Sequence, residues 1–186
     1  MPLPEQPYEV AIARPFFSGL LAEERARRRL ASALGVSEHS AFRLLKIIGG
    51  ECAGALSLIS QGQHLPEFSI EETEALSPEQ LTDVLHILRD QPLLGGEQGV
   101  RLSLAGAQDK LAVAVQDDQI ILPRDGRPTT HILKPFIEGL EGTVENELFC
   151  MTLARRLGFN APKVSMGIAG DAPYILIERY DRLHQA

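Results

Sequence analysis

The sequence predicts an α+β protein in which an N-terminal helical subdomain, residues 1–98, precedes a sheet-rich subdomain, residues 99–186. Helix formers with apolar residues at helical spacing dominate up to about residue 90, whereas short apolar runs joined by polar turns dominate from residue 100. The stretch LLGGEQG, residues 93–99, marks the change and is the predicted boundary. A further helix interrupts the later strands, and this order of helices, sheet, helix and sheet is typical of α+β folds.

Two helices are predicted within residues 15–49. The first covers residues 22–34 and ends at Gly35, because glycine readily adopts the left-handed conformation that closes a helix. The second is capped by Ser37 and closes at Gly49. Its predicted core positions recur every three residues: Phe42, Leu45 and Ile48.

One strand and one helix complete the helical subdomain, and the remaining elements form the sheet-rich one. The apolar run AGALSLIS, residues 53–60, is predicted to be a strand. SPEQ, residues 77–80, has the spacing of a capping box with proline at the first helical position, so it opens a helix that runs to about Asp90. The later predictions are strands at 100–104, 109–116, 119–122, 130–134, 163–169 and 172–179, and a helix over 144–157 that ends at Gly158.

Composition limits the classes of function. The 186 residues are 44% hydrophobic, which is enough for a core, and a net charge of −7 argues against a general binder of nucleic acid or anionic membranes. No apolar run approaches the roughly 20 residues that span a bilayer, and the N-terminus lacks the pattern of a signal peptide. Cys52 and Cys150 lie far apart without metal-ligand spacing, so we expect two reduced, buried thiols and no metal site. These features predict a soluble cytoplasmic protein.

Residues 29–48 match the pattern of a helix-turn-helix, which makes a DNA-binding regulator one alternative function. The residues that would face a major groove are Glu38, His39, Ser40 and Arg43. Any tightly packed helix pair needs the same small and apolar residues, and an acidic residue at the tip of a reading helix repels phosphates. We therefore favour plain packing. A nearby basic run is interpreted as a solvated helix face: Arg25, Arg27, Arg28 and Arg29.

The stretch SLAGAQDK, residues 103–110, places a turn of small residues between two predicted strands. Protein kinases cover the phosphates of ATP with such a loop, because backbone N–H groups approach the phosphates only where no large side chain intervenes. The sequence contains no Walker motif, so this would not be a loop of that kind. A plain hairpin tolerates the same residues, and the turn alone does not decide between the two interpretations.

Two further residues fit a phosphate-binding interpretation. Lys134 ends an apolar strand about 30 residues after the turn, where a kinase places the lysine that reaches the α and β phosphates. The following helix supplies Glu147 on a mostly apolar face, where a carboxylate needs a cation as its partner. Glu145 has equally apolar helical neighbours, so periodicity leaves both glutamates open.

Taken in order and spacing, SLAGAQDKLAV, THILKP, VENELFCMTLARRLG and ERYDR resemble the HipA family of toxin serine/threonine kinases from bacterial toxin–antitoxin modules. FFSGLLAEERARRRLA and LLKIIGGECAGALSLI also look like the family's N-terminal helical region, so the resemblance covers nearly the whole chain from Pro15 onward. It implies that residues 99–186 form an ATP-binding subdomain. This subdomain would be a kinase N-lobe-like antiparallel sheet with one αC-like helix, a phosphate loop and a hinge.

The resemblance implies a role for each motif. Ser103 would be autophosphorylated, which would eject the loop and switch the enzyme off, because added negative charge beside the triphosphate repels ATP. Lys134 would contact the phosphates and Glu147 would orient it. The phosphate loop would consist of Ala105, Gly106, Ala107, Gln108, Asp109 and Lys110. The hinge would hold adenine through the backbone of Glu178, Arg179 and Tyr180, with Asp181 near the ribose.

The resemblance also implies partners outside this sequence. The intact kinase would use ATP and Mg²⁺, but in the family the catalytic aspartate and the metal ligands follow the hinge, and this sequence stops at Ala186. We therefore expect no phosphate transfer by this chain alone, and no certain cofactor for it. The expected partners are the missing kinase C-lobe, a DNA-binding antitoxin and a protein substrate of the translation machinery, without direct contact to nucleic acid or membrane. The alternative is a stand-alone, non-catalytic module that binds a kinase lobe or an antitoxin.

Overall fold

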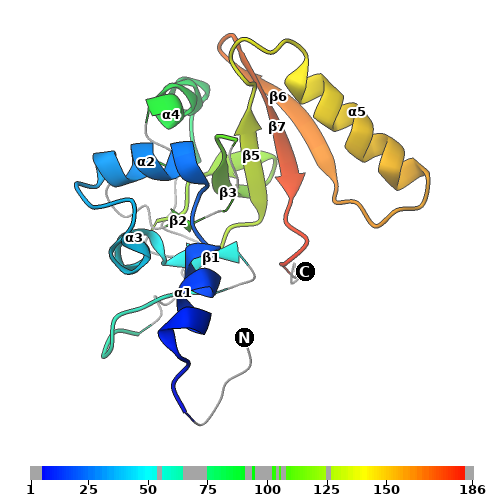
Figure 1. Cartoon of the computed structure of the whole chain (residues 1–186). Coiled ribbons are helices and arrows are strands. Elements are labelled where there is room, and N and C mark those ends of the chain that lie inside the picture. Colours follow the sequence, from blue (N-terminus) through cyan, green and yellow to red (C-terminus); the bar gives the residue numbers. More distant parts are fainter. Residues whose placement is uncertain are drawn as a thin grey trace.

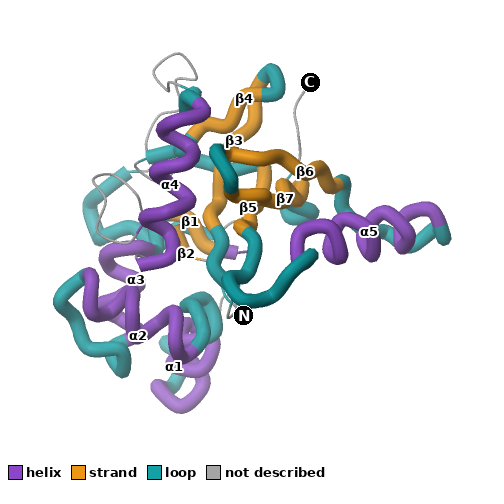
Figure 2. The backbone as a smooth tube through the Cα atoms, turned by 90° about the horizontal axis from the view of Figure 1, so that it is seen from above, coloured by secondary structure: helices purple, strands orange, loops and turns teal. Residues whose placement is uncertain are grey.

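The computed structural model describes residues 6–53, 56–64, 75–90, 94, 102–103, 105, 108–124 and 127–182. Four helices of the described part come first along the chain: α1 (Val10–Ser18), α2 (Glu24–Ala33), α3 (Ala41–Ile48) and α4 (Pro78–Asp90). A fifth, α5 (Thr143–Arg156), lies between strands of the sheet in the sequence. Both backbone views show the sheet between α1–α4 on one side and α5 on the other (Figures 1 and 2). None of these described helices is both long and apolar enough to cross a membrane.

A curled, mostly continuous antiparallel sheet forms the centre of the molecule. Within the described residues it has five strands in the order β4-β3-β5-β7-β6, and every neighbouring pair is antiparallel. Its strands are β3 (Leu111–Gln116), β4 (Gln119–Ile121), β5 (His131–Pro135), β6 (Val164–Ala169) and β7 (Ala172–Glu178). A separate parallel pair consists of β1 (Glu51–Cys52) and β2 (Leu102–Ser103). These helices and this sheet confirm the predicted α+β class, with a kinase N-lobe-like sheet and one αC-like helix.

One hydrophobic core joins the helical part to the sheet. Leu30 of α2, Leu44 of α3 and Leu85 of α4 are buried in the same cluster as Leu111 and Leu133 of the sheet. A smaller cluster fixes α5 against the opposite face: Val144, Ile175 and Ile177, with Leu148, Met151 and Val164 packed against them. Because successive residues of a strand point to opposite faces, the two clusters leave β5 and β7 covered on both sides.

Local signals correctly place several helix ends. Gly35 has φ +64°, and the N–H groups of Gly35 and Val36 donate to Ser32 and Ala31, which is the double hydrogen bond of a Schellman motif. Gly158 closes α5 with φ +86°. The capping box before α4 also forms: the backbone N–H of Ser77 donates to the Gln80 side chain, and the N–H of Gln80 donates to the Ser77 hydroxyl.

The start of α3 corrects two predictions. Its cap is Ser40 rather than Ser37, since the Ser40 hydroxyl accepts a hydrogen bond from the N–H of Arg43. The later start moves the buried face to Leu44, Leu45 and Ile48. Phe42, predicted to lie in the core, is instead 80% exposed.

Three further predictions differ from the structure. The strand expected at 53–60 is wrong, because the N–H of Cys52 donates to Leu56 and folds the chain back after β1, leaving 56–60 outside any strand. The strand expected from residue 109 begins only at Leu111. Cys52 is buried as expected, but Cys150 is exposed, because it lies on the side of α5 that faces away from the sheet. Of the predicted boundary at 93–99, all but Leu94 lies outside the described residues.

The exchange of Phe42 for Leu44 gives a direct test of the α3 packing. Leu44 is fully buried, so we expect Leu44→Ala to lower the free energy of unfolding by about 2–5 kcal/mol through lost burial and an incompletely filled cavity. Phe42→Ala, two residues away on the same helix, removes a mostly exposed side chain and should change stability by less than about 0.5 kcal/mol. Urea denaturation followed by circular dichroism measures both. A larger loss from Phe42→Ala than from Leu44→Ala would contradict this packing.

Candidate nucleotide-binding site

Lys134 and Glu147 form an ion pair between the sheet and α5. Lys134 Nζ donates to Glu147 Oε1 at 2.5 Å, and the two side chains are 20% and 25% exposed. In β5 the preceding residue, Leu133, points into the main core, so Lys134 points to the opposite face, which α5 covers. The sheet therefore sets the direction of the lysine, and the helix supplies its carboxylate partner.

Packing of α5 selects which glutamate meets the lysine. Val144 and Met151, three residues before and four residues after Glu147, pack on β7 and β6. Residues at this spacing share one helix face, so Glu147 is carried toward the sheet. Glu145 is exposed instead. The structure thus resolves the choice that periodicity left open, and it pairs Glu147 with Lys134.

The described residues of the predicted phosphate loop are held by three contacts. Lys110 Nζ donates to the backbone oxygen of Ala105 at 2.7 Å, which ties the two ends of the loop together. Gln108 Nε2 donates to the backbone oxygen of Pro135 at 3.4 Å, next to Lys134. Asp109 Oδ1 accepts from Arg29 Nη2 at 2.6 Å. Gly106, Ala107 and the side chain of Ser103 lie outside the described part; the Ser103 backbone pairs with Cys52 between β2 and β1.

Lys110 and Lys134 lie close enough to repel each other. Burial lowers the pKa of Lys110, and the positive charge of Lys134 lowers it further, whereas Glu23, Glu147 and Asp109 raise it by less. A lowered pKa shows that the ammonium charge is disfavoured in this position. A phosphate group between two such lysines would relieve both the repulsion and the loss of hydration. The arrangement therefore suits an anionic ligand.

A buried network of charges surrounds the predicted hinge after β7. Arg179 donates to Glu51 Oε1 at 2.9 Å and to both carboxylate oxygens of Asp181, at 2.9 and 2.7 Å. Thr129 donates to the same Glu51 oxygen through its hydroxyl at 2.7 Å and its N–H at 3.1 Å. Arg182 adds a contact to Glu51 at 2.6 Å. Burial lowers the pKa of Arg179, but the hydrogen bonds from Asp181 and the charge of Glu51 outweigh this, and the net pKa is raised.

Sequence reasoning missed Glu51. It lies in β1, 128 residues before Arg179, and its side chain is only 7% exposed. The only available signal was a carboxylate in the otherwise apolar and small-residue stretch IIGGECAGAL. The network gives Arg179 and Asp181 roles that the hinge prediction did not include, while Tyr180 is 93% exposed and Glu178 ends β7 opposite His131. Nothing in the arrangement tests contact of these residues with adenine or ribose.

The basic run on α2 is less solvated than predicted. Arg25 and Arg28 are exposed, but Arg27 donates to the backbone oxygens of Ser18 and Ala22, and Arg29 pairs with Asp109. The interpretation as a solvated face is therefore wrong for two of the four arginines. Both are partly buried because α2 packs beside the loop that precedes it and beside the predicted phosphate loop.

The candidate DNA-reading residues lie at the start of α3. Glu38 lies 3.7 Å from both Arg28 and His39, and Ser40 serves as the helix cap. The glutamate therefore stands where a reading helix would approach phosphates. Across the described ranges, no three His, Cys, Asp or Glu side chains gather in a way that would hold a metal ion.

The Arg29–Asp109 pair leads to a testable expectation. Both side chains are about three-quarters buried, so Arg29→Gln should loosen residues 108–110 and weaken binding of a triphosphate about fivefold, equivalent to on the order of 1 kcal/mol. Amide hydrogen exchange and nucleotide titration measure the two effects. Arg28→Gln removes a mostly exposed arginine and is the matched control. Exchanging the charges, Arg29→Asp with Asp109→Arg, should restore part of the affinity, and a failure to do so would argue against the ion pair.

The fold and the Lys134–Glu147 pair define the class: an N-lobe-like sheet of the protein-kinase type, with one αC-like helix. Two family models match the chain, the HipA N-terminal domain at residues 1–59 and the HipA-like C-terminal domain at residues 102–186. The chain therefore belongs to the HipA family, as a partial HipA-like protein.

Comparison with individual proteins agrees. The chain is 41% identical over 192 residues to "Putative kinase Y4mE" of Sinorhizobium fredii, covering 100% of this chain and 45% of that protein. It is 31% identical over 170 residues to "Serine/threonine-protein kinase toxin HipA" of Shewanella oneidensis, covering 90% of this chain and 37% of the relative. A solved structure from Shewanella oneidensis, titled as a toxin–antitoxin complex of HipA, HipB and operator DNA, superposes with a TM-score of 0.70 at 28% identity. The alignment covers 91% of this chain and 39% of that one, so the chain spans less than half the length of these relatives.

Proposed function

We propose that this chain is the nucleotide-binding N-terminal portion of a HipA-like toxin serine/threonine kinase. The observation that carries the proposal is the Lys134–Glu147 ion pair beside the loop that contains Lys110. A lysine held by a carboxylate of the αC-like helix is what protein kinases use to position ATP phosphates. The names of the relatives, a kinase toxin among them, support the same assignment.

In the proposed site each residue has a distinct task. Lys134, held by Glu147, presents its ammonium group to the α and β phosphates, and Lys110 keeps the loop closed through Ala105. Small residues at 105–107 leave the backbone N–H groups open to the phosphates. Residues 178–180 offer backbone groups to adenine. When bound, ATP with Mg²⁺ supplies the transferable γ-phosphoryl group.

Regulation and partners follow from the same family analogy. Ser103 would accept a phosphoryl group on its hydroxyl oxygen, and the added charge would repel ATP from the adjacent loop. The C-terminal lobe of the whole enzyme would supply the catalytic aspartate and the metal ligands. The whole enzyme would phosphorylate a protein of the translation machinery in the cytoplasm and pair with a DNA-binding antitoxin.

The test of nucleotide binding is an NMR titration of the isotopically labelled chain with a non-hydrolysable ATP analogue and Mg²⁺. We expect weak, saturable shifts at residues 105–110 and around Lys134, because only one side of the nucleotide pocket is present. Incubation with radiolabelled ATP should leave Ser103 unlabelled. An absence of shifts at millimolar nucleotide, or shifts confined to other regions, would contradict the proposal, and labelled Ser103 would contradict the expected inactivity of this chain alone.

A stand-alone binding module is the second candidate, and the outer face of α5 favours it. Phe149, Leu153 and Leu157 recur every four residues on this face and are 66%, 43% and 67% exposed. An apolar stripe of this kind fits a second protein surface such as a kinase lobe. Detection of the native product by antibody and intact mass discriminates the two: a product of 20.4 kDa favours the module, and a clearly larger one favours the kinase portion.

A further inference from the structure

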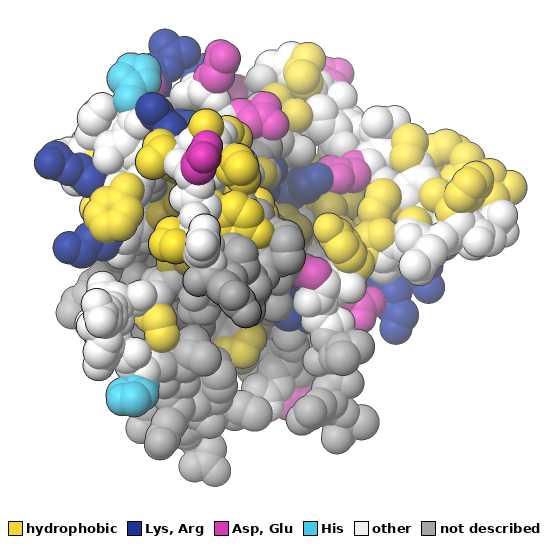
Figure 3. Space-filling model, turned by 60° about the horizontal axis from the view of Figure 1, so that its bottom comes forward, with side chains coloured by type: hydrophobic (Ala, Val, Ile, Leu, Met, Phe, Trp, Pro, Cys, Tyr) yellow, Lys and Arg dark blue, Asp and Glu magenta, His cyan; other side chains and the backbone are white. Residues whose placement is uncertain are grey.

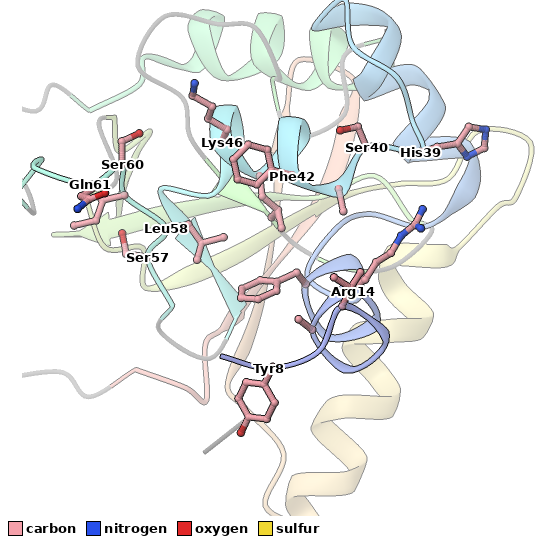
Figure 4. A pocket seen from close by; sticks show the side chains of 16 residues that line it. Tyr8, Arg14, His39, Ser40, Phe42, Lys46, Ser57, Leu58, Ser60 and Gln61 are labelled. Carbon is pink, nitrogen blue, oxygen red and sulfur yellow. The ribbon is translucent and has the colours of Figure 1, made fainter. Parts of the chain in front are cut away.

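A large groove lies on the helical part of the chain, outside the candidate nucleotide-binding site. It is enclosed by α1, by α3 and by residues 57–61, and its volume is about 1130 Å³. Phe17, Leu45 and Leu58 contribute to an apolar floor. Figure 4 shows Arg14 of α1 and Lys46 of α3 at the edges of the groove. The volume is comparable to that of ligand pockets and is enough for several large side chains.

Several apolar side chains at this groove face solvent. Phe42 is 80% exposed, Val10 is 75% exposed and Ile59 is 41% exposed, and all three line it. Phe42 lies between the labelled groups of the rim in Figure 4. The space-filling view from below shows apolar side chains at the surface with Lys and Arg side chains around them (Figure 3). Exposed apolar patches with a polar rim are typical of protein-interaction sites.

The charge of the rim is opposite to that of the chain. Arg14 and Lys46 line the groove together with His39, and none of the described lining residues is acidic. Glu24 and Glu38 lie near Arg14, but they line a neighbouring depression rather than the groove. The whole chain carries a net charge of −7, so a basic rim here is a local feature. Charge complementarity therefore favours an acidic occupant.

We propose that this groove binds an acidic amphipathic segment of a partner protein. Apolar side chains of the segment would pack between Phe42 and Leu58, and its carboxylates would meet Arg14 and Lys46. This is the helix-in-groove mode of recognition, with anchors at helical spacing. The site is independent of the nucleotide-binding proposal, because none of its lining residues belongs to the loop, the Lys134–Glu147 pair or the hinge.

Two other occupants fit the groove less well. A second copy related by two-fold symmetry would bring Arg14 and Lys46 against their own equivalents, which repel. Nucleic acid would gain contacts from only two permanent cations, whereas phosphate-backbone binding normally draws on many more. An apolar floor also contributes little to a sugar–phosphate backbone. A peptide with both apolar and acidic faces uses the floor and the rim together.

Three fluorescent helical peptides of equal length test the proposal with the 186-residue chain. The first carries Leu and Phe at i, i+3, i+4 and i+7 with Glu on the polar face; the second replaces every Glu by Lys; the third replaces the apolar anchors by Ser. We expect saturable anisotropy changes with the first peptide only, weakening as salt is raised. Equal binding of the Lys or the Ser peptide would overturn the charge or the groove argument, respectively.

Variants of the chain locate the binding site. Phe42→Ala should weaken the acidic peptide about tenfold, because a buried aromatic anchor contact is lost. Phe149→Ala on α5 is the matched control, 66% exposed and outside the groove, and should leave affinity unchanged. Arg14→Glu combined with Lys46→Glu should abolish binding of the acidic peptide and favour the Lys peptide. Loss of affinity in the control, a short DNA duplex that displaces the peptide, or a dimer that Phe42→Ala dissociates would each overturn the proposal.

Discussion

Lys134→Met is expected to weaken binding of a non-hydrolysable ATP analogue by roughly 10- to 100-fold, which is the largest effect on the candidate nucleotide-binding site. A charge-assisted hydrogen bond contributes about 1.5–3 kcal/mol, and methionine has a similar length without the charge. The substitution also leaves the Glu147 carboxylate without its 2.5 Å partner, so its negative charge would then repel the phosphates. Isothermal titration calorimetry or NMR titration measures the affinity.

Lys163→Met is the control for this substitution. Lys163 is also a lysine at a strand of the same sheet, but it is exposed and lies just before β6. We expect its replacement to leave nucleotide affinity within about twofold, because a solvated charge at this distance is largely screened. Equal losses from both substitutions would show that general positive charge, rather than a positioned lysine, attracts the nucleotide.

The two glutamates of α5 provide a second comparison within the same test. Glu147→Gln keeps the shape of the side chain but weakens its hold on Lys134, so it should reduce affinity by less than Lys134→Met does. Glu145→Gln changes an exposed side chain two residues away and should have no effect. Equal effects of the two substitutions would contradict the positioning role of Glu147.

Local sequence rules predicted those parts of the fold that are held by hydrogen bonds within a few residues. Gly35 ends α2, and Ser77 with Gln80 opens α4, because these bonds join neighbours in the chain. At α3 two serines three residues apart could each act as the cap. Packing of Leu44 into the core favoured the later one, and no local rule contains that information.

The candidate site was predicted to a similar extent. The order of the small-residue turn, Lys134 and the glutamate-bearing helix was readable, since it follows the chain. The choice of Glu147 depended on which face of α5 packs on the sheet. The Arg29–Asp109 and Glu51–Arg179 pairs join residues 80 and 128 positions apart, and contacts over such separations leave no periodic pattern in a single sequence.

Glu51→Leu is expected to lower the free energy of unfolding by about 3–5 kcal/mol. The Glu51 side chain is 7% exposed and that of Arg179 only 2%, so removal of the carboxylate leaves a buried guanidinium without part of its compensation. Thr129 would lose the acceptor for both its hydroxyl and its N–H at the same time. Urea denaturation measures the change, with Glu38→Gln as the control, because that glutamate pairs at 3.7 Å with an exposed arginine.

Glu51→Gln separates the loss of charge from the loss of hydrogen bonds. The amide oxygen can still accept from Thr129, so this variant should be less destabilised than Glu51→Leu, whereas Arg179 loses its buried counter-charge in both. If Glu51→Leu cost less than about 1 kcal/mol, the network would be solvated and would not hold the hinge. A loss of the expected size would mean that β1 of the helical part fixes the position of residues 179–182, because Glu51 is the group on which Arg179 and Arg182 converge. The helical part would then be required for the geometry of the hinge as well as for the core.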